Sequence, residues 1–276
     1  MHIPNLMNPA VWLLALVLSL GMTSAAEAAE EIVALTEPSS DIVMSFTVAG
    51  RVKNVPVREG QAVKAGDLLI ELNVEALEAR LKQLTLEAEN QAEVLASEAE
   101  LKQKRQDLIK LERAFRKGAA TRIELEHARL DVEISEFRLQ AARHTQEVAV
   151  FKKEEAEAEI KEYRMLSPVD GLVEKIEVEV GESAKTSEDA VRVVALNPLW
   201  VETDAPLERF GDLSPGRELK VTFPDGLETA GRLVFRGAVA DSASETVRVR
   251  LEVANPQGRH AGERVVLSIP ENKKGR

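Results

Sequence analysis

The chain contains no cysteine and few aromatic residues, and both absences narrow what it can do. Without cysteine it can form no disulfide, thiolate metal site, cysteine nucleophile or lipid-modified N-terminal cysteine, so we expect no lipid anchor. Only 4% of the 276 residues are aromatic, although 44% are hydrophobic. This composition argues against a disordered chain and favours long helices packed along narrow seams over a single thick core.

The chain also lacks an excess of positive charge, since 47 Asp and Glu outnumber 36 Lys and Arg and the formal net charge is −11 at pH 7. Proteins that bind DNA or RNA without sequence preference need clustered Lys and Arg to neutralise phosphates. We therefore expect no nucleic-acid partner. The length suggests about two domains.

Long apolar runs are missing as well. The run Ala10–Leu20 has about half of the roughly 20 residues that a membrane-spanning helix needs. It is followed by small residues and the motif Ala26-Glu27-Ala28, which is typical of a signal-peptide cleavage site. Residues 1–28 are therefore predicted to be a signal peptide. Because no Lys or Arg precedes the run, an uncleaved anchor is the alternative.

Two distant segments share one pattern, GRVKNVPVREG from Gly50 and GLVEKIEVEVG from Gly171. A shift of 121 residues superposes Gly50 on Gly171, and it aligns three apolar positions and a second glycine, Gly60 on Gly181. Apolar residues largely alternate with polar ones up to that glycine, as in a short strand that enters a turn. We expect the two copies to pack on each other, with chance alternation as the alternative.

Helix-forming sequence separates the two copies. It runs from Asn73 to Arg116 without Gly or Pro, breaks at Lys117-Gly118, and resumes from Thr121 to about Tyr163. Thr121 and Glu124 fit a capping box at the second start. Two arms of similar length joined by a short break predict an antiparallel coiled-coil hairpin.

The packing seam of this hairpin is predicted from heptad spacing. In the first arm the phase slips by one residue before Leu101, which predicts a local change in supercoil. The predicted seam residues are Leu77, Leu81, Leu84, Ala88, Gln91, Leu95, Leu101, Leu108 and Phe115 in the first arm, and Leu130, Ile134, Phe137, Ala141, His144, Val148 and Phe151 in the second.

Charge is unevenly distributed along the hairpin. Between Leu101 and Arg122, near its tip, there are eight basic residues, and only Asp107 and Glu112 oppose them. One interpretation is an ordinary solvated helix surface with i,i+4 pairs. The other is an electropositive tip that meets an acidic partner.

The sequence after Leu196 consists of short alternating segments separated by turn residues such as Ser214-Pro215-Gly216. This spacing predicts a small antiparallel barrel or sandwich. The segments are PLWVETD, RELKVTF, GRLVFRGAV, TVRVRLEV and RVVLSI.

In the order of these parts, and in several motifs, the chain resembles the periplasmic adaptor subunits, or membrane fusion proteins, of the HlyD-like efflux and secretion family, most closely the RND-type efflux adaptors. The resemblance covers about residues 32–270. It is carried by VAGRVKNVPVREGQAVKAGDLLIEL and SPVDGLVEKIEVEVGE for two lipoyl-like halves, by RKGAATRIELEHA for the hairpin tip, and by ETVRVRLEVANPQGRHAGERVVL for the last barrel strands.

The resemblance implies a multidomain α+β fold, in which a lipoyl-like barrel-sandwich hybrid is interrupted by a long antiparallel α-helical coiled-coil hairpin and followed by a small antiparallel β-barrel. The expected parts are the signal peptide (1–28), an N-terminal strand and first lipoyl-like half (29–72), the hairpin (73–164, tip near 117–121), the second half (165–197), the barrel (198–270) and a tail (271–276).

The resemblance also implies a function. Adaptors of this kind couple an inner-membrane transporter, of RND or ABC type, to an outer-membrane channel in the periplasm of Gram-negative bacteria. They do so as homo-oligomers, commonly of six copies, whose hairpin tips touch the channel. In a lipoyl or biotinyl carrier domain, the modified lysine sits between the two halves. Helices occupy that place here, so we expect no carrier function and no cofactor.

At the tip the sequence departs from many pump-type adaptors, which carry Arg, Leu and Ser at fixed spacing. Those positions are Lys110, Ala114 and Thr121 here, so the apolar anchor is smaller. The departure motivates an alternative, a non-transporting envelope scaffold or regulatory module on the same fold. The expected channel-contacting residues are Lys110, Arg113, Ala114, Arg116, Lys117, Gly118, Thr121, Arg122 and Glu124.

No pattern predicts catalysis or metal binding. The four histidines form no H-x-x-x-H motif, and no nucleophile elbow or Gly-rich phosphate loop occurs. His144 is expected to be a partly buried, hydrogen-bonded seam residue. Met44 and Met165 are expected to pack beside the lipoyl-like halves, and Trp200 is expected in the barrel core.

Overall fold

The computed structural model describes residues 30–210 and 213–269. The predicted signal peptide and tail lie outside the described residues. The chain divides into two compact units, one made of residues up to Ser39 and from Leu196 onward, the other of Ser40–Ala195. In the described part, no helix is long and apolar enough to cross a membrane.

The first unit is a β-barrel. Its strands follow the order β1-β12-β9-β10-β11-β8, and β1 also pairs with β8, so the six strands close on themselves. A one-turn helix, α5 (Leu207–Phe210), follows β8. The strands are β1 (Glu30–Ser45), β8 (Asp189–Pro206), β9 (Glu218–Thr222), β10 (Glu228–Arg236), β11 (Thr246–Val253) and β12 (Arg264–Ile269). The end of β1 and the start of β8 belong to the second unit.

Alternation along the strands builds the barrel core. In β11, Val247, Val249, Leu251 and Val253 are buried, whereas the arginines between them lie on the outer face. Facing residues of β9, β10 and β12, including Val221, Leu233 and Leu267, complete one cluster. The predicted small antiparallel barrel is confirmed, because each of the five expected segments supplies one of its strands.

The second unit contains the two repeated halves, and the predicted repeat is confirmed. The shift of 121 residues that aligned the sequences places β2 on β6, β3 on β7, and β4 on the start of β8. The strands of this unit are β2 (Gly50–Asn54), β3 (Ala62–Val63), β4 (Leu68–Leu72), β5 (Arg164–Leu166), β6 (Gly171–Ile176) and β7 (Ser183–Ala184).

Each half pairs with the other in the same way. Gly50 lies opposite Ala184, and the shift converts this pair into the observed pair of Gly171 and Val63. The turn glycines follow the same rule, because the Gly60 N–H donates to the Val173 carbonyl and the Gly181 N–H donates to the Val52 carbonyl, both at 2.8 Å. The two glycines have φ of 79° and 93°, a region that disfavours other residues.

The two halves enclose one apolar core that includes Val52 and its repeat equivalent Val173. Met165 is 7% exposed in this core and Met44 packs against it, so the expected packing role of both methionines is confirmed.

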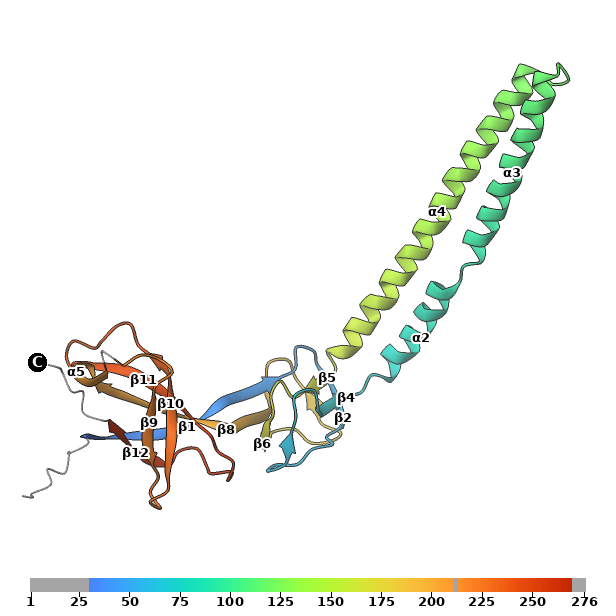
Figure 1. Ribbon diagram of the computed structural model, residues 1–276. Helices are drawn as coiled ribbons and strands as arrows, with labels where there is room; N and C mark the ends of the chain where they lie inside the picture. Colours follow the sequence, from blue (N-terminus) through green and yellow to red (C-terminus); the bar gives the residue numbers. More distant parts are fainter. Residues whose placement is uncertain (1–29, 211–212, 270–276) are drawn as a thin grey trace, which may run out of the picture. The chain divides into compact units, whose positions relative to one another are not determined.

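Three helices form an arm between the halves: α2 (Glu75–Glu89), α3 (Ala92–Arg116) and α4 (Arg122–Lys161). The unbroken α4 runs beside both α2 and α3 (Figure 1). The prediction of one continuous helix from residue 73 to 116 is wrong, because the chain leaves the helix at Asn90 and Gln91. The Asn90 side chain accepts a hydrogen bond from the Ala92 N–H at 3.1 Å, a local bond that competes with helix continuation.

The break also corrects the seam of the first arm. Leu77, Leu81, Leu84 and Ala88 are at least partly buried as predicted, but Gln91 is exposed and Leu95 is 58% exposed. The phase slip therefore takes the form of a helix break. After the break the face toward α4 follows the heptad Val94, Ser97, Leu101, Lys104, Leu108 and Leu111. The predicted seam residues Leu101 and Leu108 are therefore confirmed, whereas Phe115 is 40% exposed and its prediction is wrong.

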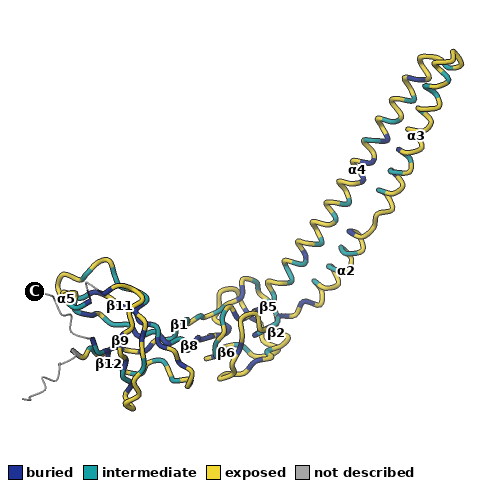
Figure 2. Tube along the Cα trace, viewed as in Figure 1, coloured by how far each residue is buried: buried dark blue, intermediate teal, exposed yellow. Residues whose placement is uncertain are grey.

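The predicted seam of α4 is wrong. The buried or half-buried side chains follow a different heptad, Leu125, Ala128, Val132, Ser135, Leu139, Ala142, Gln146, Ala149, Lys153 and Ala156. The larger apolar residues that were expected there are exposed, with Phe137 at 61% and Phe151 at 59%. The predicted and the observed seam residues both follow a seven-residue repeat. In the observed seam every second position has a small side chain, which lets the helices approach closely. Most of the arm is exposed (Figure 2).

Ion pairs on the arm's surface fix the register of α3 and α4. Lys104 contacts Asp131 at 2.7 Å, and this pairing raises the pKa of the lysine. Two arginines of α4 reach back to α3 in the same way, Arg138 to Glu100 at 2.8 Å and Arg143 to Glu98 at 2.7 Å. Because these pairs are exposed, each is worth about 0–1 kcal/mol, so they specify alignment more than stability.

Candidate partner-binding tip of the arm

The tip of the arm is a short, fully defined turn. At the end of α3, the Lys117 N–H donates to the Ala114 carbonyl and the Gly118 N–H donates to the Phe115 carbonyl, both at 3.0 Å, and Gly118 has a φ of 71°. Glycine suits this left-handed conformation because it has no Cβ. The predicted break at residues 117–118 is confirmed.

The predicted capping box starts α4. The Thr121 hydroxyl oxygen accepts from the Glu124 N–H at 3.3 Å, and the Glu124 carboxylate accepts from the Thr121 N–H at 2.7 Å. The hydrogen bonds from the Thr121 backbone and then its hydroxyl lower the pKa of Glu124. Thr121 and Glu124 therefore hold the turn rigid, and their polar atoms are already engaged.

The predicted basic cluster divides into paired and unpaired cations. Lys104 and Arg105 pair with acids of α4, Lys110 with Asp107 at 3.2 Å, and Arg122 with Glu126 at 3.0 Å. Among the described residues, four cations of this segment have no ion pair: Lys102, Arg113, Arg116 and Lys117.

Three of the unpaired cations, Arg113, Arg116 and Lys117, lie within five residues at the end of α3 and are exposed. Ala114 is half-buried. The tip thus offers guanidinium and ammonium donors beside the exposed apolar side chains of Phe115 and Ile123. Such a surface suits an acidic partner, because arginine binds carboxylates with two parallel hydrogen bonds.

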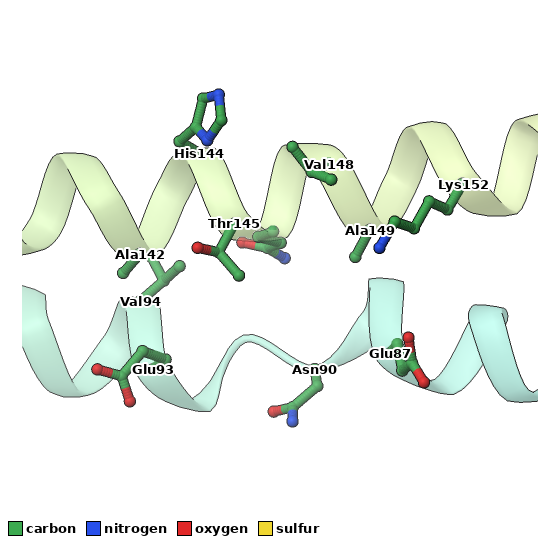
Figure 3. Close-up of a pocket in the computed structure, with 11 residues that line it drawn as sticks. Glu87, Asn90, Glu93, Val94, Ala142, His144, Thr145, Val148, Ala149 and Lys152 are labelled. Carbon is green, nitrogen blue, oxygen red and sulfur yellow. The ribbon is translucent and has the colours of Figure 1, made fainter.

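The helix break at Asn90 and Gln91 forms a concave feature. Between the break and α4 there is a cavity of about 440 Å³, lined by polar side chains such as Asn90 and Lys152 and by apolar ones such as Val94 (Figure 3). His144 of α4 points away from the α2–α3 side in this view. The expectation of a partly buried, hydrogen-bonded His144 is wrong, since the residue is exposed.

One surface cluster on the barrel was missed. Trp200, expected in the core, is half-buried, and the Arg250 guanidinium lies 3.9 Å from its ring centroid. Arg250 and Arg248 both bind Glu202, whose side chain is 11% exposed. Burial alone would raise the pKa of Glu202, but hydrogen bonds from Arg248 and Arg250 outweigh it and lower the pKa. Strand alternation could have placed Trp200 on the outer face, since Leu199 and Val201 beside it are buried.

In the described residues, no group of three or more His, Asp or Glu side chains is arranged to hold a metal ion. His127 and His260 are exposed, like His144.

Comparison with known proteins agrees with this architecture. Residues 43–196 match the family model described as RND MFP, barrel-sandwich hybrid domain. The nickel-cobalt-cadmium resistance protein NccB of Alcaligenes xylosoxydans xylosoxydans is 24% identical over 82% of this chain and 52% of its own length. The nodulation protein NolF of Rhizobium meliloti is 27% identical over 82% of this chain and 59% of its own length. The chain thus spans little more than half of the curated relatives it matches.

The crystal structure of MacA from Actinobacillus actinomycetemcomitans superposes with a TM-score of 0.71 at 16% identity. The match covers 87% of this chain and 79% of that one. At this identity the likeness concerns the fold.

Proposed function

Because the chain belongs to the RND membrane-fusion-protein family, we propose that it is a periplasmic adaptor that couples an inner-membrane transporter to an outer-membrane channel. The observation that carries the proposal is the family's barrel-sandwich hybrid, interrupted by a helical arm whose tip bears three unpaired cations. The role is structural, without catalysis.

In this proposal the arm acts as a coiled-coil hairpin and a spacer. The 40 residues of α4 give a length of about 60 Å at 1.5 Å per residue. Arg113, Arg116 and Lys117 meet carboxylates of the channel. Several copies form a ring, and six is the number that the family resemblance implies. Relatives named for metal resistance and for nodulation each match 82% of this chain, so we assign the choice of cargo to the transporter.

The direct test uses the absence of native cysteine. Arg116→Cys, treated in intact cells with a thiol-anchored crosslinker, should give an adduct with an outer-membrane channel. Glu155→Cys, exposed near the other end of α4, is the control and should give none. Adducts of Arg116→Cys only with itself or with unrelated envelope proteins would contradict the proposal and favour a scaffold.

A second test removes the spacer while keeping the tip. Leu108→Pro should interrupt α3, since proline removes a backbone hydrogen bond and clashes with the preceding turn. Transport should be lost although the protein is still exported, whereas Leu108→Ala should transport. Unchanged tolerance of toxic compounds in the Leu108→Pro strain, relative to the deletion strain, would contradict the spacer role.

A further inference from the structure

The heptad that faces α4 in α2 cannot continue into α3. In α2 it consists of Leu77, Leu81, Leu84 and Ala88. Extended beyond Ala88 as one helix, the same spacing would turn a polar or charged side chain toward α4 at every second seam position. These residues are Gln91, Glu98, Arg105 and Glu112. An unbroken helix would therefore place charges where α2 has leucines.

The break changes the phase of this heptad. The residues of α3 that face α4, such as Leu101 and Leu108, stand one position earlier than the α2 spacing requires. One position corresponds to a turn of about 100° around the helix axis. Asn90 is extended, with φ of −76° and ψ of 100°, and Gln91 has φ of −95° and ψ of 7°. These two residues let α3 start again with leucines toward α4, so the break follows from the packing of both helices.

The arm beyond the break is held together by ion pairs. It consists of α3 and residues 122–143 of α4, which we call the outer segment. In the described structure, five ion pairs join the two helices there, and the pair nearest the break is Glu98 with Arg143, at 2.7 Å. Because such pairs fix the alignment of α3 on α4, we treat the outer segment as one body.

The arm before the break is tied to the sandwich core. It consists of α2 and residues 149–161 of α4, which we call the inner segment. At its base the Leu72 N–H donates to the Tyr163 carbonyl at 2.9 Å, and the Asn73 N–H donates to the Arg51 carbonyl at 2.8 Å. Leu72 is itself fully buried in the core. These bonds hold the inner segment in one direction relative to the sandwich.

Between the two segments α4 runs through unbroken, and its packing there is loose (Figure 3). The cavity of about 440 Å³ separates it from the break, and the α4 seam residues that line this cavity include the small Ala142 and Ala149. The Thr145 hydroxyl donates to the Ala141 carbonyl at 3.0 Å, a kind of bond that often bends helices. Among the described residues, no ion pair joins residues 144–148 of α4 to α2 or α3. Bending of α4 at this level therefore breaks no ion pair between the helices.

We propose that the break is a hinge, at which the outer segment swings relative to the inner segment. A hinge consists of a few residues that absorb a change in φ and ψ between two rigid parts, and Asn90 and Gln91 lie between two such parts. The cavity gives room for the movement. The proposal rests on the proposed function, in which the hinge lets the tip change direction toward the channel while the sandwich stays in place.

Distances between spin labels test the hinge in the purified full chain, which has no native cysteine. Lys82→Cys with Lys102→Cys straddles the break, whereas Ala96→Cys with Arg116→Cys lies within α3, and all four positions are exposed. Both pairs are 20 residues apart, about 30 Å in a straight helix. The distance distribution of the straddling pair should be at least twofold broader than that of the pair within α3. Equal widths would overturn the proposal.

A one-residue insertion should remove the hinge. One alanine inserted between Asn90 and Gln91, combined with Asn90→Ala, moves the leucines of α3 onto the heptad of α2, so one continuous helix can form. The height of the tip is kept, because one extended and one near-helical residue advance about 5 Å and three helical residues advance about 4.5 Å. The straddling distribution should then narrow to the width of the pair within α3.

Asn90→Ala without the insertion is the matched control. It removes the side-chain bond to the Ala92 N–H but leaves the two heptads out of phase, so the straddling distribution should stay broad. A narrow distribution with Asn90→Ala alone, or a broad one after the insertion, would contradict the assignment of the hinge to the change of phase. In cells, the insertion should reduce transport at least threefold relative to Asn90→Ala at equal export. Unchanged transport would contradict the need for the hinge.

The outcomes separate this proposal from the adaptor function. A broad straddling distribution in a protein whose Arg116→Cys tip captures no channel would support the hinge and remove the adaptor role. Equal widths in a protein whose tip forms a channel adduct would overturn the hinge and leave the adaptor role standing.

Discussion

The barrel buries its large apolar side chains, whereas the arm leaves many of its own exposed. In the barrel, Leu233, Val249 and Leu251 are fully buried within one chain. In the arm, α3 and α4 bury few large residues against each other, whereas Phe137 and Phe151 remain exposed. In a closed sheet, alternate residues of each strand point into the barrel or out to solvent, so the apolar ones are buried. A helix that packs against one neighbour also has an outer face, and that face can be apolar. The difference teaches that the barrel buries its large apolar residues within one chain, whereas the arm leaves many of its own exposed.

The largest effect is expected in the barrel core. Leu251→Ala should destabilise the barrel by about 2–5 kcal/mol, because it leaves a cavity in a closed core. Denaturant unfolding followed by tryptophan fluorescence reports on this unit, since Trp200 is one of two tryptophans and the other, Trp12, lies in the predicted signal peptide. Leu101→Ala in the arm, followed by circular dichroism, should cost less. An equal loss of stability for Leu251→Ala and Leu101→Ala would contradict the difference between barrel and arm.

A smaller effect on stability is expected at Gly50 and Gly171, the equivalent glycines of the two repeated halves. A Cβ at Gly171 would lie 2.4 Å from the backbone oxygen of Val194, which cannot move without disturbing the sheet. At Gly50 the nearest atom is the Leu72 Cδ1 at 3.1 Å, the end of a side chain that can shift. Gly171→Ala should therefore cost about 1–3 kcal/mol and Gly50→Ala less. Hydrogen exchange of the sandwich strands measures both, and the reverse order would contradict the packing described.

The pH dependence of the barrel should contain a contribution from Glu202. Because its pKa is lowered in the folded state, its stabilisation is fully present above the ordinary glutamate pKa and is lost as pH falls through the lowered value. Glu202→Gln should therefore be less stable than the parent at pH 7, and the difference should shrink below about pH 4. Urea titrations of the Trp200 signal at both pH values check this. A difference that grows on acidification would refute the assigned role.

The smallest effect is expected on the outer face of α4. Phe137→Ser should change the stability of the isolated protein by less than about 0.5 kcal/mol, because the side chain is 61% exposed. Leu139→Ser, two residues away on the buried seam, should cost several times more. Thermal unfolding followed by circular dichroism at a dilute concentration compares them. A large loss for Phe137→Ser alone would mean that the Phe137 side chain packs against another part of the chain.

The features that could be predicted from the sequence are those that follow strict local rules. The repeat, the barrel strands, the break at Gly118 and the Thr121 capping box depend on alternation, on left-handed glycine and on a short side-chain bond, and the structure has all of them. The phase of the α4 seam was not readable. The α4 sequence contains two sets of residues with heptad spacing. The set that becomes buried is the one whose small side chains let α2 and α3 approach closely, and the positions of the larger apolar residues do not predict it.

The helix break at Asn90 escaped prediction for a related reason. Nothing but a phase slip marked it, and a slip can be absorbed by supercoil or by a break. At the tip, the sequence identified the cations but not the ion pairs, so it could not separate Lys110, which binds Asp107, from Arg113 and Arg116.

The most direct test of the central claim compares thiol accessibility on the two faces of α4. Phe137→Cys and Leu139→Cys would be treated with a maleimide, once as dilute purified protein and once in intact cells. We predict that Phe137→Cys reacts fast in the purified protein and is protected in cells, whereas Leu139→Cys reacts slowly in both. Equally fast reaction of Phe137→Cys in both settings would contradict the proposed ring, in which a partner covers the outer face of the arm.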